Sequence, residues 1–117
     1  MRFTGKTAIV TGAAGGIGSA VATQFAREGA NLCLADTRPE IAVAQEIRAL
    51  GRAVIEQLTD VTDSAAVRLM VARTLEAFGR VDILVNVAGV SSHGSSEQVT
   101  DAEWDRVLTN NLKSVFL

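Results

Sequence analysis

The chain has 117 residues, the length of a single domain and enough to bury a core. Hydrophobic residues make up 48% of it, which excludes a disordered chain, and its formal net charge of −2 offers no basic surface for nucleic acid. The single cysteine, Cys33, excludes an internal disulfide framework and favours a reducing, cytoplasmic compartment. We expect neither a signal peptide nor a membrane span, because the longest apolar runs are only strand-sized.

Short apolar strands alternate with helical patterns along the chain. In order, the expected strands cover residues 7–11, 31–35, 53–58 and 81–86. The expected helices cover residues 16–28, a segment from Pro39 to Gly51, a segment from a Thr62 or Asp63 cap to Gly79, and a segment that starts at the capping box of residues 100–103 and still continues at Leu117. This alternation implies right-handed crossovers, so we expect an α/β fold with a doubly wound parallel sheet covered on both faces.

Residues 11–18, Thr-Gly-Ala-Ala-Gly-Gly-Ile-Gly, lie where the first strand turns into the first helix. A helix start offers unpaired N–H groups and the positive end of the helix dipole, and glycine lets a phosphate approach the backbone. We therefore expect a polyphosphate ligand, although a tight connection alone also uses glycine. The residues expected to bind it are Gly12, Gly15, Gly16, Ile17 and Gly18. The spacing differs from the common dinucleotide fingerprint and lacks the lysine of a P-loop.

The spacing Thr-Gly-x-x-x-Gly-x-Gly resembles the cofactor motif of the short-chain dehydrogenase/reductase family. Three later landmarks match that family in the same order: Asp60-Val61, Asn86-Val87-Ala88-Gly89 and Asn111. The resemblance covers essentially the whole chain. Within the family, the sequence is similar to the 3-oxoacyl reductase branch and to the sugar or polyol dehydrogenase branches. It implies that residues 1–117 form the N-terminal, NAD(P)-binding part of a single-domain enzyme, a Rossmann-type sheet truncated after its fourth strand and part of the following helix.

Asp36 follows the second strand, where a doubly wound sheet faces the adenosine ribose of a dinucleotide. A carboxylate there accepts hydrogen bonds from the ribose hydroxyls and repels a 2′-phosphate, so we expect NAD in preference to NADP. Arg38 favours the opposite choice, because an arginine can bind a 2′-phosphate. A plain turn cap is the structural alternative for Asp36.

The resemblance assigns the later landmarks to the same cofactor. Asp60 and Val61 would hold the adenine, through a side-chain and a backbone hydrogen bond, although an aspartate at that point also caps helices. The segment at 86–89 would steady the end of the sheet and bring backbone close to the ribose and nicotinamide. Its second residue departs from the family's asparagine, which weakens a side-chain role there. The matching positions are Asn86, Ala88 and Gly89.

Asn111 is the one catalytic residue that the resemblance assigns to this chain. In relatives the backbone carbonyl at this position holds a water that links the proton relay to the active-site lysine. An asparagine in a helix is otherwise simply exposed, and Asn110 lies beside it. The family's Tyr-x-x-x-Lys is absent, since the chain contains no tyrosine, and no serine stands in the place of the family serine. We therefore expect little or no turnover from these 117 residues alone.

Ser91, Ser92 and His93 occupy the loop that forms one wall of the substrate site in relatives. A lone histidine without partners predicts no metal site. The resemblance also implies a homo-oligomer, because the last helix builds the main dimer interface in relatives. The fourth strand would be an open, apolar edge of the sheet.

Two functions from different classes remain open. The first is an NAD(P)-dependent oxidoreductase that transfers a hydride between nicotinamide and a small alcohol or ketone. The second is a non-catalytic module that binds a dinucleotide without redox chemistry. A serine and a Tyr-x-x-x-Lys downstream of Leu117 would favour the enzyme. An unrelated nucleotide-binding domain, such as a methyltransferase, is disfavoured by the landmarks at 60–61 and 86–89.

Overall fold

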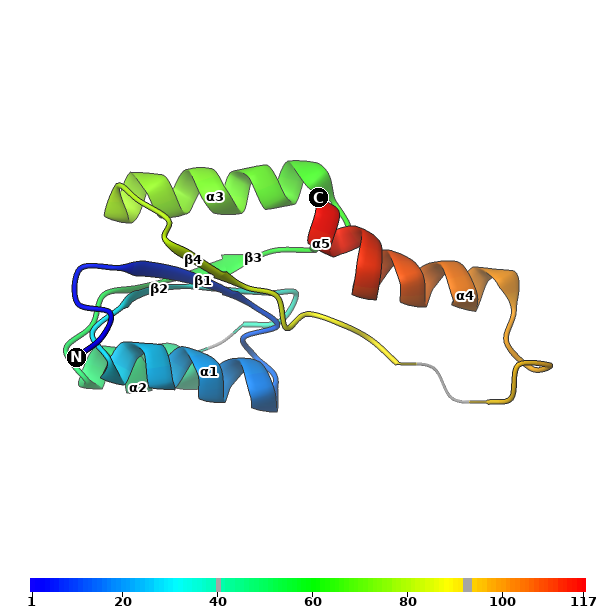
Figure 1. Cartoon of the computed structure of the whole chain (residues 1–117), viewed down its shortest axis with the longest axis horizontal. Coiled ribbons are helices and arrows are strands. Elements are labelled where there is room, and N and C mark those ends of the chain that lie inside the picture. The colour runs from blue at the N-terminus through cyan, green and yellow to red at the C-terminus, as the bar shows by residue number, and fades with distance from the viewer. Residues whose placement is uncertain (40, 92–93) are drawn as a thin grey trace.

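The computed structural model describes residues 1–39, 41–91 and 94–117, and strands alternate with helices along the chain (Figure 1). The strands are β1 (Thr7–Thr11), β2 (Asn31–Asp36), β3 (Val54–Leu58) and β4 (Ile83–Val85). The helices are α1 (Gly16–Arg27), α2 (Ile41–Ala49), α3 (Ser64–Phe78), α4 (Asp101–Leu108), the π-helical turn η1 (Thr109–Lys113) and α5 (Ser114–Phe116). The predicted α/β class is confirmed.

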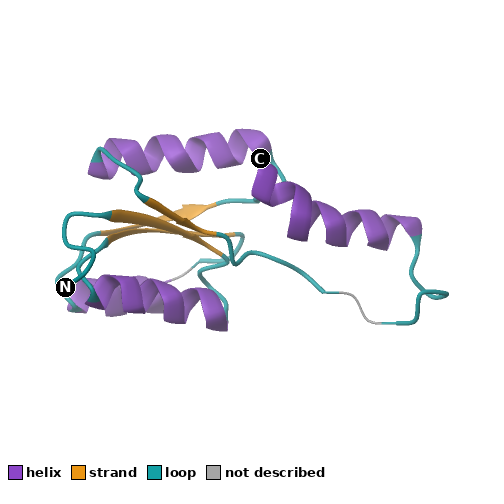
Figure 2. Cartoon of the chain, in the orientation of Figure 1, coloured by secondary structure: helices purple, strands orange, loops and turns teal. Residues whose placement is uncertain are grey.

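The four strands form one parallel sheet in the order β3-β2-β1-β4. Helices α1 and α2 cover one face and α3 covers the other, so the sheet lies between two helical layers (Figure 2). Strand β1 is central, and its Ile9 lies opposite Cys33 of β2 and Leu84 of β4. The doubly wound topology predicted from the sequence is confirmed, with β4 at one edge of the sheet.

Alternate side chains of β1 enter two separate cores. Ala8 and Val10 belong to the core shared with α1 and α2, whereas Ile9 between them packs in the cluster that contains Met70 of α3. Successive side chains of a strand point to opposite faces, so a strand covered on both faces must be apolar throughout. All five residues of β1 are buried, which fixes the start of the turn that follows it.

Two elements, α2 and β4, begin two residues later than the sequence predicts. The prediction that Pro39 opens the second helix is wrong, because α2 begins at Ile41. The Arg38 N–H donates to Asp36 Oδ1 at 3.1 Å, and this local turn bends the chain before the helix. The fourth strand is shorter than the predicted 81–86, and just beyond it the N–H groups of Val87 and Ala88 donate to the side chain of Thr11 in β1.

The last helical segment begins as predicted. Thr100 caps α4, and its Oγ1 accepts the Glu103 N–H at 3.1 Å. The helix then widens into η1 before α5 follows. A π-turn closes its hydrogen bonds over five residues, which changes the faces on which neighbouring side chains lie. Figure 1 shows α4 starting away from the sheet, with the chain then running back toward the start of α3.

Candidate functional site

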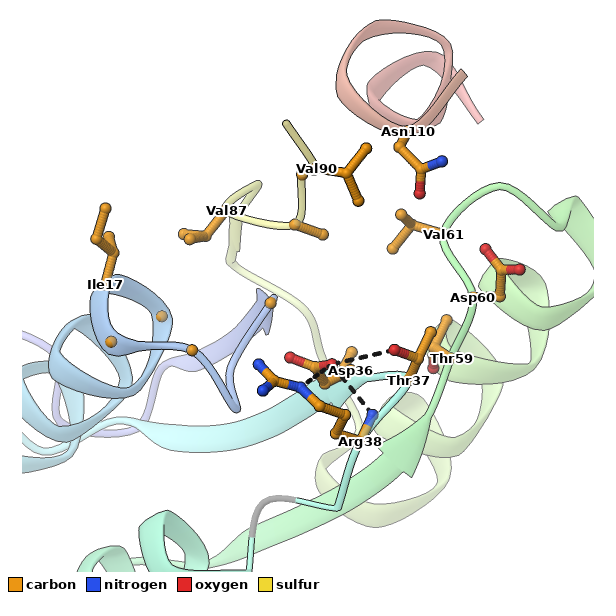
Figure 3. Close-up of a pocket in the computed structure, with 17 residues that line it drawn as sticks. Ile17, Asp36, Thr37, Arg38, Thr59, Asp60, Val61, Val87, Val90 and Asn110 are labelled. Carbon is orange, nitrogen blue, oxygen red and sulfur yellow. Dashed lines mark hydrogen bonds and ion pairs between the residues drawn. The ribbon is translucent and has the colours of Figure 1, made fainter. Parts of the chain in front are cut away.

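A cavity of about 430 Å³ opens at the carboxyl ends of the four strands (Figure 3). In open parallel sheets, ligands bind in the crevice beyond these ends, at the point where the connections reverse direction, here between β1 and β4. The predicted cofactor residues that line the cavity are Gly12, Gly15, Gly16, Ile17, Gly18, Asp36, Asp60, Val61, Ala88 and Gly89. Asn86 borders a second, more apolar cavity with Leu84 and Phe116, so its cofactor role stays a prediction.

Two glycines of the turn are required by the protein's own packing. Gly12 has a φ of +67°, and a Cβ there would lie 2.8 Å from the Ala88 backbone nitrogen. A Cβ on Gly18 would overlap the carbonyl group of Gly12, lying 2.7 Å from its carbon. Because both positions are glycine, the start of α1 can pack directly against the turn, and the turn can pack directly against the segment after β4. Gly12 and Gly18 therefore build the cavity wall.

Gly15 and Gly16 have no such reason to be glycine. Neither has a positive φ, and a Cβ on Gly16 would meet nothing within 4 Å. On Gly15 the nearest atoms would be Gly12 O at 3.4 Å and the Arg38 guanidinium at 3.9 Å, which is ordinary contact. Both residues line the cavity at the start of α1, which has no side-chain cap and no acidic residue in its first turn. The free space and the uncapped N–H groups suit an anion that approaches the backbone.

Asp36 joins the end of β2 to the glycine turn. Its Oδ2 accepts the Ala14 N–H at 3.0 Å, and its Oδ1 accepts the Arg38 N–H. The Arg38 Nε lies 3.8 Å from Oδ1, and the Asp36 side chain is only 10% exposed. The carboxylate therefore caps the turn while it also borders the cavity, so the two sequence interpretations of Asp36 are compatible.

Asp60 faces the cavity after β3, in a local turn of its own. Its Oδ1 accepts hydrogen bonds from the Thr62 hydroxyl at 2.6 Å and the Thr62 N–H at 2.9 Å. These bonds, the hydroxyl first, hold the pKa of the Asp60 carboxyl below its usual value, so it is a carboxylate at neutral pH. The helix cap of α3 is Asp63, which accepts from the N–H groups of Ala65 and Ala66. Asp60 is therefore not the residue that caps this helix.

Replacing the Thr62 hydroxyl tests this arrangement. We expect Thr62→Val to raise the pKa of Asp60, because it removes the hydrogen bond with the largest effect and keeps the backbone one. The folded-state pKa lies below the unfolded one, so the stabilisation is present above the unfolded pKa and is lost as the pH falls through the folded pKa. Titration of the Asp60 carboxyl by NMR measures the shift. An unchanged pKa in the valine variant would contradict the assignment.

The segment after β4 is held from both sides by side chains. Thr11 Oγ1 accepts the N–H groups of Val87 at 3.1 Å and Ala88 at 3.2 Å, across the β1–β4 boundary. Sequence reasoning gave Thr11 no role of its own. From the other side, Arg106 of α4 donates to the Ser91 carbonyl at 3.0 Å. The backbone of this segment is therefore fixed where it borders the cavity.

The two adjacent asparagines of η1 lie on different sides. The Asn111 side chain makes two hydrogen bonds to the backbone of Val90: its Oδ1 accepts the N–H and its Nδ2 donates to the carbonyl, both at 2.7 Å. Asn110, which sequence reasoning passed over, lines the cavity near Val61 and Val90 (Figure 3). Neighbouring residues of a helix project in different directions, so one asparagine lines the cavity while the next contacts Val90. The catalytic role of Asn111 through its carbonyl stays a prediction.

The proposed substrate wall is only partly described. Ser91 is exposed, whereas Ser92 and His93 lie outside the described residues. Within the described ranges, no group of three or more His, Cys, Asp and Glu side chains is placed to hold a metal ion. No helix in the same ranges has the length and apolar character needed to cross a membrane.

Comparison with known proteins gives a consistent result. Residues 6–117 match the family model described as short chain dehydrogenase. The chain is 44% identical over 116 residues to the oxidoreductase UcpA of Escherichia coli, covering 98% of this chain and 44% of UcpA. A short chain dehydrogenase from Burkholderia cenocepacia in complex with NADP is 40% identical with a TM-score of 0.94, over 99% of this chain and 49% of that one. A Mycobacterium paratuberculosis short chain dehydrogenase bound to NAD is 25% identical with a TM-score of 0.95, over 99% and 48%. The chain thus spans about half the length of the relatives it matches.

Proposed function

The chain belongs to the short-chain dehydrogenase family, and from this premise we propose that it is the cofactor-binding half of an NAD(P)-dependent oxidoreductase acting on an alcohol or ketone. The observation that carries the proposal is that neither packing nor backbone conformation requires glycine at positions 15 and 16, whereas close approach of a ligand to the backbone would. A pyrophosphate fits there, because it needs close approach to backbone N–H groups at the start of α1. The nicotinamide of the bound dinucleotide would supply the hydride chemistry.

The lining residues divide the binding work. The start of α1 would bind the pyrophosphate, and Asp36 would accept hydrogen bonds from the ribose hydroxyls. Asp60 and Val61 would bind the adenine. On the other side, Thr11 and Asn111 keep the segment after β4 rigid, so that Ala88 and Gly89 present backbone to the nicotinamide half. A rigid wall reduces the ordering cost of binding.

Asp36 supports the choice of NAD over NADP. Its carboxylate borders the cavity, and a 2′-phosphate beside it would bring two negative groups together. Arg38, the residue that favours NADP, already pairs with Asp36. Competitive titration of the full-length protein with NADH and NADPH tests this choice, and tighter binding of NADPH would overturn it.

Proton transfer would come from outside these residues, since the 117 residues contain no tyrosine. A serine and a Tyr-x-x-x-Lys in the other half would complete the enzyme, with the Asn111 carbonyl as a link in the proton relay. The alternative is a protein that binds the dinucleotide without turnover. Measuring oxidation of NADH by the full-length protein against a panel of ketones separates the two.

Gly16→Val is the direct test of the binding proposal. The valine side chain would fill the space left for the phosphate, so we expect NADH affinity to fall about tenfold or more while the urea midpoint of unfolding stays close to that of the unchanged protein. Ala20→Val, on an exposed position of the same helix outside this cavity, is the matched control and should bind normally. Equal NADH affinity in the Gly16 variant would count against a phosphate at this turn.

Exposed apolar side chains support a homo-oligomer. Trp104, Leu112 and Phe116 are 61%, 67% and 87% exposed on α4, η1 and α5. Large apolar patches of this kind mark interaction surfaces. We propose that this segment contributes to an interface between copies, and a monomeric native mass of the full-length protein would contradict it.

We also propose a cytoplasmic location, supported by the single buried thiol of Cys33.

A further inference from the structure

Asn110 places a hydrogen-bond acceptor in the cavity. Its Nδ2 donates to the Arg106 carbonyl at 2.9 Å, which closes a local bond within the helix. This bond orients the amide so that its oxygen points away from the helix, toward Val61 (Figure 3). The side chain thus combines a fixed orientation with an exposed acceptor, as expected of a group that reads a ligand.

A second acceptor borders the same end of the cavity. Oδ1 of Asp60 accepts both hydrogen bonds from Thr62. Oδ2 of the same carboxylate accepts no hydrogen bond from the described residues. Val61 lies between Asp60 and Asn110, Val90 lies on the other side of Asn110, and the apolar side chains of both line the cavity (Figure 3). Two apolar side chains suit a flat ring, and two acceptors suit an edge that carries two N–H donors.

We infer that Asn110 is a specificity residue for the purine base, and that its amide oxygen and the Asp60 carboxylate both accept hydrogen bonds from an exocyclic amino group. This inference rests on the proposed function, because it names the contacts of the bound dinucleotide. The 6-amino group of adenine has two hydrogens and can satisfy both acceptors. A 6-oxo base such as hypoxanthine would place its own acceptor against them and would lose both bonds.

The test compares NADH with its hypoxanthine analogue, the reduced nicotinamide hypoxanthine dinucleotide, as ligands of the full-length protein. We expect the unchanged protein to bind NADH about tenfold more tightly or better, the value of at least one net hydrogen bond. In Asn110→Leu, which keeps the size and removes the amide, NADH affinity should fall and the analogue should lose little. The ratio of the two affinities should therefore move toward one.

The outcomes separate the possible roles of Asn110. If Asn110 only closes its helix, Asn110→Leu will weaken both ligands equally, and the inference is overturned. A contact with the nicotinamide carboxamide would have the same result, because both ligands carry that group. Lys113→Gln, an exposed change in the same π-turn, should leave both affinities unchanged.

The unchanged protein also tests the inference, even if Asn110→Leu does not fold. Equal binding of both dinucleotides would overturn the role of Asn110 and leave the proposed function intact. Binding of neither dinucleotide would overturn the proposed function, and the inference with it.

Discussion

Gly18→Ala is expected to destabilise the protein by about 3 kcal/mol, the upper range for forcing an extra group into packed structure. The added methyl would overlap the Gly12 carbonyl group and lie 2.9 Å from the Ala13 Cα, and both are backbone atoms that cannot rotate away. Relief would require the start of α1 to move off the glycine turn. The free energy of unfolding from urea denaturation, followed by circular dichroism, measures the loss.

Gly16→Ala is the matched control for this prediction. It adds the same methyl at the start of the same helix, where nothing lies within 4 Å. Alanine also has the better helix propensity, so this variant should be as stable as the unchanged protein or slightly more stable. Equal unfolding free energies for the two alanine variants would refute the packing role assigned to Gly18.

Thr11→Val is expected to lower the free energy of unfolding by about 2 kcal/mol, because it leaves two partly buried N–H groups without their acceptor. The Thr11 side chain is almost fully buried, and its hydroxyl is the point where β1 holds the segment after β4. Valine has nearly the same shape, so the loss reports the hydrogen bonds and not a cavity. Amide hydrogen exchange at Val87 and Ala88 should accelerate in the variant.

Thr74→Val is the control, because this hydroxyl is equally buried but donates to the Met70 carbonyl of its own helix. That carbonyl is at the usual i−4 position of a helix, so the change should cost far less. Normal protection of the Val87 and Ala88 amides in the Thr11 variant would refute the role of the Thr11 hydroxyl.

Local patterns in the sequence predicted most of the fold and much of the candidate site. The glycine turn, the Thr100 cap and the order of strands and helices follow from neighbouring residues, so they can be read along the chain. The carboxyl ends of parallel strands meet at one edge of the sheet, so the position of Asp36 after its strand predicts that it borders the cavity, whereas Asp60 is assigned there through the family resemblance.

The remaining features depend on contacts between distant segments. Thr11 bonds to Val87, 76 residues away, and no local pattern marks a buried threonine as such an acceptor. Which of the two asparagines lines the cavity depends on how η1 packs against the segment after β4, and the side-chain types do not encode that packing. The second cavity likewise brings together Asn86 and Phe116, which lie far apart in the sequence.

One wall of the cavity, the glycine turn with Asp36, is held by a bond between residues close in the sequence. The opposite wall, the segment after β4, is held by bonds between residues far apart in the sequence, and this difference affects folding. The bond from Ala14 to Asp36 spans 22 residues, whereas the bonds from Thr11 to Val87 and Ala88 span 76 and 77. A longer loop costs more entropy to close, and during synthesis its far end leaves the ribosome later. The glycine turn and its aspartate can therefore form while β4 is still being synthesised, and the opposite wall closes onto a turn that already exists.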